Sequence, residues 1–195
     1  MKNNARVVVI GGGVVGVSTL YHLVKKGWTD CVLIERKELT SGSTWHAAGL
    51  LPLFNMSYSV GQIHKYSVDL YGRLEQETGQ YAGLSRVSNI RLATTQDRMD
   101  EYKQYAGVAQ TIGVQVDILT PDEVVDIWPL AVKDNLIGAI RHPMDGYIQP
   151  ADLTQALAKG ARDIGGQIYR NTNVTAITRT PVSYTHLRAH ETPAN

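Results

Sequence analysis

The first forty residues carry the clearest pattern of hydrophobic and polar positions in the chain. A short β-branched run at 6–10 is typical of a strand buried on both faces of a parallel sheet, and it ends in three glycines. From Val14 to Lys26 the apolar residues recur at helical spacing, and Gly27 is the expected end of that helix. A second apolar strand follows at 31–34. The pattern therefore predicts a strand–helix–strand unit with parallel strands.

The other elements are predicted from weaker patterns. A loop or short helix of small residues is expected at 41–49, and a long amphipathic helix at about 60–78. Further strands are expected at 89–94, 116–119, 136–141, 167–169 and 174–178, and further helices at 97–112, 121–128 and 151–164. We interpret the chain as α/β. A Rossmann-like, doubly wound sheet occupies 5–88 and 149–181, and a mixed α+β lobe is inserted at 89–148.

The last fourteen residues, 182–195, follow no helical or strand period and are expected to be disordered. Their sequence resembles a peptide that arises when sequencing-adapter DNA is translated. We therefore interpret this tail as non-native, and residues 1–181 as the N-terminal part of an incomplete domain.

Composition narrows the function classes. With 43% hydrophobic residues, a chain of 195 residues can bury a core, and 19 basic against 18 acidic residues leave a charge of +1 without a basic patch for nucleic acid. Cys31 is the single cysteine, so neither an internal disulfide nor a cysteine-rich metal site is expected. No apolar run has the length of a membrane span, which favours a cytoplasmic protein without a membrane partner.

The first turn carries the strongest chemical motif. Gly11, Gly13 and Gly16 form G-x-G-x-x-G between the first strand and the helix. Glycines there permit a tight turn, close approach to a pyrophosphate and close packing of helix on sheet, while the helix start attracts the phosphates. Glu35 lies 19 residues after Gly16 at the end of the second strand, where a carboxylate can accept hydrogen bonds from ribose hydroxyls. The motif predicts a dinucleotide site.

The glycine motif alone does not separate FAD from NAD, because both cofactors share the same ADP half. The segment 41–50 is rich in hydroxyls and small residues, and it could line a second side of the binding site of an extended FAD. In an NAD-dependent dehydrogenase this segment would have no role in cofactor binding, so FAD is favoured.

Several stretches of the chain carry a specific resemblance. They are the glycine motif, Glu35-Arg36, and the segments 39–50, 74–79, 90–94 and 145–150. In these stretches the chain resembles the flavin-dependent dimethylglycine and sarcosine dehydrogenases of the D-amino-acid-oxidase superfamily, over about residues 5–179.

The resemblance implies roles for particular residues. In that family the histidine of a Trp-His pair carries FAD covalently, and by the resemblance this role falls on His46. By the same resemblance Glu35 and Arg36 meet the adenosine end, Ser43 and Thr44 the middle of the cofactor, and Val174 the adenine through its backbone. Arg36 could equally be a solvated surface charge and Val174 an ordinary buried strand residue.

The implied reaction is oxidative demethylation of an N-methylated glycine derivative, dimethylglycine first and sarcosine second. Its partners would be a small amine substrate, an electron-carrier protein or oxygen as acceptor, and folate only through a region beyond this chain. The family's catalytic acid and base also lie beyond it, so none is assigned, and the 195-residue chain alone is expected to be inactive and poorly stable. The alternative is a non-catalytic homologue like the regulatory subunit of pyruvate dehydrogenase phosphatase.

The remaining candidate side chains are expected to be structural. His22, His64 and His142 lack metal-ligand spacing, and no metal is predicted. The tyrosines at 66, 71, 102 and 105 recur at helical intervals and are expected to pack. Asp145-Gly146 is expected to form a turn.

Overall fold

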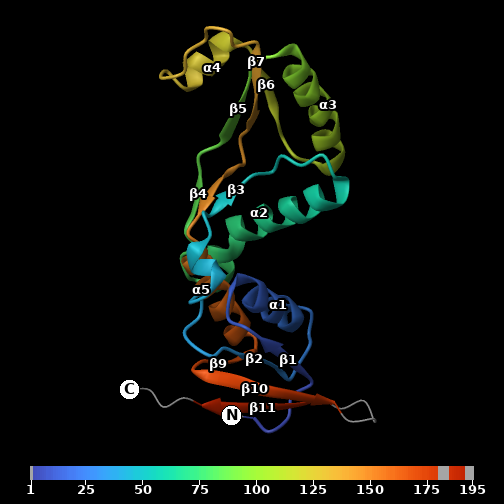
Figure 1. Cartoon of the computed structure of the whole chain (residues 1–195), viewed down its shortest axis with the longest axis vertical. Helices are drawn as coiled ribbons and strands as arrows, with labels where there is room; N and C mark the ends of the chain where they lie inside the picture. Colours follow the sequence, from blue (N-terminus) through green and yellow to red (C-terminus); the bar gives the residue numbers. More distant parts are fainter. Residues whose placement is uncertain (1, 180–184, 192–195) are drawn as a thin grey trace. The chain divides into compact units, whose positions relative to one another are not determined.

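The computed structural model describes residues 2–179 and 185–191, and it divides into two compact units. The first unit contains Met1–Ala48, Arg73–Gly83 and Gln149–Asn195, and the second contains Gly49–Gly72 and Leu84–Ile148 (Figure 1). Each unit is built from several separate stretches of the sequence.

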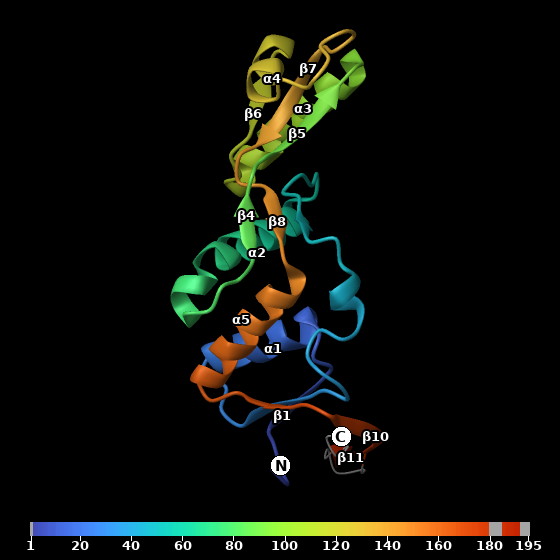
Figure 2. The same cartoon turned by 90° about the vertical axis from the view of Figure 1, so that its left-hand side faces the viewer.

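The first unit is built on a three-stranded parallel sheet. Its strands are β1 (Val7–Ile10), β2 (Cys31–Ile34) and β9 (Gln167–Tyr169), in the order β1-β2-β9. Helices α1 (Val14–Lys25) and α5 (Pro150–Asp163) lie on one side of this sheet, and strand β10 (Thr172–Arg179) lies on the other (Figure 2). Helix α1 buries one face of apolar residues, namely Val17, Leu20, Tyr21 and Val24.

The parallel strand–helix–strand unit confirms the predicted α/β class. Val7 pairs with Cys31 and Ile10 with Ile34, in parallel and without a register shift. In the described residues, however, both sheet-covering helices lie on the same face, and strands rather than helices lie on the other.

The C-terminal segment differs from the expectation of disorder. Residues Thr185–Glu191 form strand β11, which pairs antiparallel with β10 from Thr172↔Glu191 to Arg179↔Thr185. Backbone hydrogen bonds build this pairing, so it needs no alternation of side-chain types. The rest of the expected tail lies outside the described residues, and its non-native origin stays a prediction.

The second unit contains two antiparallel sheets. One has the order β3-β8-β4 and consists of β3 (Leu50–Leu51), β8 (Gly146–Ile148) and β4 (Leu84–Arg86). The other has the order β5-β7-β6 and consists of β5 (Asn89–Ala93), β7 (Gly138–His142) and β6 (Asp117–Leu119). Its helices are α2 (Tyr58–Thr78), whose last turns belong to the first unit, α3 (Gln96–Ile112) and α4 (Pro121–Ile127).

The boundaries of the inserted lobe differ from the predicted 89–148. The second unit also includes 49–72 and 84–88, because β3 and β4 both pair with β8. These three strands have two or three residues each, too few to show an alternation in the sequence. The Thr120–Glu123 capping box at the start of α4 is present.

Within the described residues, none of the helices combines the length and apolar character needed to cross a bilayer.

Candidate nucleotide-binding site

The glycine turn between β1 and α1 has a geometry that other residues cannot adopt without strain. Gly11 has φ = +110°, and its N–H donates to the carbonyl oxygen of Ile34 at 2.9 Å. A Cβ at Gly16 would lie 2.0 Å from the carbonyl oxygen of Gly11, so the turn and the helix touch through bare backbone. The motif therefore has the close helix–strand packing that its spacing predicts.

The start of α1 presents backbone donors, one of which is already bonded. Because the helix begins at Val14, the N–H groups of Val14, Val15 and Gly16 have no acceptor within the helix. The hydroxyl oxygen of Thr44 accepts the Val14 N–H at 2.9 Å. The N–H groups of Val15 and Gly16, together with the positive helix end, are the donors that an anion would meet.

Thr44 belongs to a short 3-10 helix, η1 (Ser43–His46), in the segment expected to face the cofactor. The Thr44 side chain is buried, whereas Ser43 and His46 are exposed and Trp45 is 68% exposed. The fold thus brings Thr44 to the start of α1 and leaves Ser43 and His46 at the surface of the same turn.

Glu35, at the end of β2, faces the glycine turn. One carboxylate oxygen accepts the Gly12 N–H at 2.6 Å, and the other accepts the Lys37 N–H at 2.7 Å. A carboxylate has about four lone-pair sites, so each oxygen can accept a further hydrogen bond. Glu35 therefore stabilises the conformation of the turn, and its carboxylate can still accept hydrogen bonds from ribose hydroxyls.

One pocket of about 190 Å³ brings together predicted residues from three distant stretches of the chain. Gly11, Glu35, Arg36 and Val174 line it, with Ile10, Ile34, Thr172 and Asn173. The volume is below the roughly 300 Å³ of pockets for drug-sized ligands, so it suits one end of a dinucleotide. Ser43, Thr44 and His46 do not line this pocket, and Gly13 and Gly16 lie at the neighbouring helix start.

Thr172 and Asn173 are pocket residues that the sequence reasoning missed. Thr172 is almost fully buried, and its N–H donates to the carbonyl oxygen of Glu35 at 2.9 Å, which joins the start of β10 to the end of β2. No motif in the sequence marks these residues. Their only signal is that they precede Val174.

The described part of the chain brings no three of its histidine, cysteine, aspartate and glutamate side chains together as a metal-binding group. The chemistry of the site rests on backbone N–H groups and one carboxylate. This donor and acceptor set fits the diphosphate and ribose of an adenine dinucleotide.

Comparisons with known proteins agree with this geometry. Residues 6–193 match the family described as FAD dependent oxidoreductase (DAO). The chain is 43% identical to the mitochondrial dimethylglycine dehydrogenase of Rattus norvegicus over 180 residues, which are 92% of this chain and 21% of that protein. It is 41% identical to the mitochondrial pyruvate dehydrogenase phosphatase regulatory subunit of Mus musculus over 170 residues, 87% of this chain and 19% of that protein.

A solved structure shows the same fold. Glycine oxidase from Geobacillus kaustophilus superposes with a TM-score of 0.75 and 30% sequence identity, covering 95% of this chain and 51% of that one. The chain spans about a fifth of the length of the two relatives named above. Since the family match covers nearly the whole chain, the chain belongs to the FAD dependent oxidoreductase family.

Proposed function

We propose that this chain is the nucleotide-binding, N-terminal part of an enzyme that oxidatively demethylates an N-methylated glycine derivative, with dimethylglycine as first substrate and sarcosine as second. The observation that carries the proposal is the pocket at which Gly11, Glu35 and Val174 converge beside the start of α1. The likeness to dimethylglycine dehydrogenase supports the substrate class.

The residues at this site have distinct tasks in binding FAD. Val15 and Gly16 donate backbone N–H groups to the diphosphate, Glu35 accepts from the ribose, and the backbone at Val174 faces the adenine. Arg36 is exposed at the rim of the same pocket. When bound, the flavin supplies a two-electron acceptor for the N-methyl carbon of the substrate.

Covalent attachment of the flavin through His46 is the finer part of the proposal. Its support is the resemblance together with the exposed position of His46, in the same turn as Thr44, which bonds to the start of α1. A neutral imidazole nitrogen is a nucleophile near neutral pH.

Acid precipitation of the full-length parent protein tests both parts. Yellow colour that stays with the pellet supports the covalent link, and His46→Ala should move the colour to the supernatant while His22→Ala should not. Free flavin released from the unmodified protein contradicts the covalent link. A protein without any flavin contradicts the enzyme and favours the alternative.

The alternative is a non-catalytic regulatory homologue, which the second relative keeps open. The presence of His46 favours the enzyme, because by the resemblance this residue carries the flavin. An electron-carrier partner, a folate site in a further region and a cytoplasmic location stay predictions, and the names of both relatives include the word mitochondrial. Turnover of dimethylglycine or sarcosine by the 195-residue chain would contradict its predicted inactivity.

A further inference from the structure

The segment that joins α4 to β7, residues 127–137, carries large apolar side chains at the surface of the second unit, and we call it the α4–β7 loop. Five of these side chains are at least 41% exposed, namely Ile127, Trp128, Leu130, Val132 and Ile137. Leu130, the most exposed of them, reaches 86%. Single exposed apolar residues are ordinary on soluble proteins, whereas a group of them within one short segment is typical of a surface that contacts another molecule.

The α4–β7 loop is held in one conformation by hydrogen bonds and by packing. The Ala131 N–H donates to the carbonyl oxygen of Trp128 at 2.9 Å, and the Leu136 N–H donates to that of Lys133 at 3.0 Å. Leu136 is buried in a core cluster with Val124 of α4, and Ala131 packs against the same cluster. Because the loop is already ordered, it loses little conformational freedom when a partner binds.

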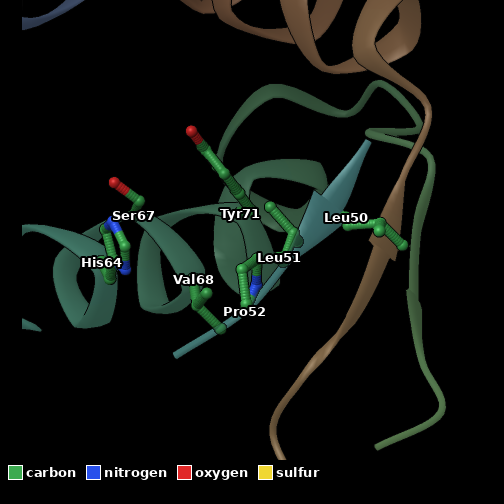
Figure 3. Close-up of a pocket in the computed structure, with 7 residues that line it drawn as sticks. All are labelled: Leu50, Leu51, Pro52, His64, Ser67, Val68 and Tyr71. Atoms are coloured by element: carbon green, nitrogen blue, oxygen red, sulfur yellow. The ribbon is translucent and has the colours of Figure 1, made fainter. Parts of the chain in front are cut away.

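The exposed side chains of the loop are not used by the core of the second unit. Helices α4 and α3 lie on opposite faces of the sheet β5-β7-β6, and each face has its own core cluster (Figure 1). Val68, which lines a pocket between β3 and α2 (Figure 3), belongs to the cluster packed against α3. Leu130 and Val132 belong to neither cluster, so within the described residues their side chains are available to a partner.

Acidic side chains accompany the apolar ones. Asp122 forms an exposed ion pair with Lys133 at 2.8 Å. The hydrogen bond with Asp122 raises the pKa of Lys133, and the nearby charges of Asp126 and Asp134 add to this effect. Both of these carboxylates are exposed, and neither forms an ion pair in the described part of the chain. Three carboxylates and one ammonium group leave this surface with a net negative charge.

The charges favour one kind of partner over the others. An anionic membrane surface attracts basic segments, and it would repel these carboxylates. A two-fold contact with a second copy would place Asp126 and Asp134 opposite the same residues of that copy, and like charges disfavour such a contact. A protein segment with lysines or arginines around its apolar side chains complements both the apolar and the acidic groups.

We propose that the α4–β7 loop is a docking site for a separate partner protein, whose contacting segment carries apolar side chains flanked by lysines or arginines. Trp128 and Leu130 are the central apolar contacts, since tryptophan is prominent among the residues that dominate interface energies. Asp126 and Asp134 pair with the basic residues at the edge of the contact. The site uses no residue of the nucleotide pocket, so it does not depend on the proposed function.

Peptides of designed composition test this surface on the full-length parent protein. The probe is a helical peptide of about 18 residues, with leucines on one face and lysines on the other. One comparison peptide replaces the lysines with glutamates, and a second replaces the leucines with alanines. Measured by fluorescence anisotropy at low salt, each comparison peptide should bind at least about 10-fold more weakly than the probe.

Two results of this titration overturn the proposal. The first is a probe that does not bind, which is the outcome expected if another segment of the parent covers the loop. The second is a glutamate peptide that binds as tightly as the probe. A photoreactive group on the probe should label the segment 126–134, and labelling that misses this segment also overturns the proposal.

Substitutions of exposed side chains locate the binding. Trp128→Ala combined with Leu130→Ser should weaken binding of the probe by at least about 10-fold. Asp126→Asn combined with Asp134→Asn should weaken it by about 3-fold and make it less sensitive to salt. Trp28→Ala is the matched control for Trp128→Ala, because Trp28 is a 41% exposed tryptophan of the first unit. Equal losses in these two variants, with urea midpoints unchanged in both, contradict the assignment.

The other occupants give different results in the same variants. If the parent is a dimer that Trp128→Ala alone converts to a monomer in sedimentation, the loop contacts a second copy and the proposal is wrong. If the parent binds vesicles of phosphatidylcholine and phosphatidylserine, and Leu130→Ser abolishes this binding, the loop contacts a membrane and the proposal is equally wrong. None of these measurements requires flavin, so their failure is distinct from a failure of the acid-precipitation test.

Discussion

Asp145 and His142 form a pair of buried titratable groups whose pKa values are displaced in opposite directions. Asp145 is 1% exposed, and burial raises its pKa to about 6 against the opposing effects of the Leu53 N–H and Arg91. His142 is fully buried, and burial, with Arg91 adding to it, lowers its pKa to about 4. The ordinary values are 3.8 and 6.5, so between about pH 4 and pH 6 the folded protein carries a proton on Asp145 and the unfolded chain carries one on His142.

The two groups have opposite effects on the pH dependence of stability. The lowered pKa of His142 gives stability that is present above about pH 6.5 and lost as the pH falls to about 4, which corresponds to about 3 kcal/mol. The raised pKa of Asp145 gives stability that is present below pH 3.8 and lost as the pH rises through about 6, also about 3 kcal/mol. The pair should therefore cancel to within about 1 kcal/mol over this range.

Asp145→Asn should remove the Asp145 contribution, so that the difference from the unmodified chain measures this contribution alone. The amide keeps an oxygen to accept the Leu53 N–H but does not titrate. We expect the free energy of unfolding of the variant, relative to the unmodified chain, to be about 3 kcal/mol higher at pH 7 than at pH 4.

Urea unfolding of both chains at four pH values between 4 and 7 measures this difference, because all other groups cancel in the comparison. His142→Gln should give a slope of the opposite sign. Asp122→Asn, an exposed acid paired with Lys133, is the control and should leave the difference flat above pH 4. A difference for Asp145→Asn that does not change with pH would refute the reasoning.

Three further predictions concern the first unit. Gly16→Ala should lower the free energy of unfolding by more than about 2 kcal/mol, because the added Cβ would lie 2.0 Å from a backbone oxygen. The control is Gly107→Ala in α3, where a Cβ would have no atom within 4 Å, and this change should raise the free energy of unfolding by up to about 1 kcal/mol. Urea midpoints in the reverse order would contradict the prediction. Thr44→Val should cost about 1 kcal/mol by removing the acceptor at the start of α1, and Thr44→Ser should restore most of it in the same assay. Glu77→Gln should lower the free energy of unfolding by about 1 kcal/mol at pH 7, because hydrogen bonds from Lys25 first, and then from the Tyr21 and Arg73 side chains, lower the pKa of Glu77 to about 2. This loss of stability should shrink as the pH falls from 4.5 towards 2. A loss that stays constant with pH would contradict a role for these bonds.

The sequence by itself determined the strand–helix–strand unit, its glycine turn and the position of Glu35. These features depend on neighbours in the chain. Helical spacing is visible within one helix, Gly11 needs its positive φ whatever surrounds it, and the capping box at Thr120 involves residues three apart. The same locality allowed the family resemblance to be recognised from short motifs.

The tertiary structure alone decided which distant residues meet. It placed Val174 and Thr172 beside Glu35, brought the Thr44 hydroxyl to the start of α1, and joined three very short strands into one sheet of the second unit. It also buried His142 and Asp145, whose sequence context indicates only a structural histidine and a turn. Burial, and the pKa values that follow from it, depend on how other segments pack around a residue, and no local pattern encodes that packing.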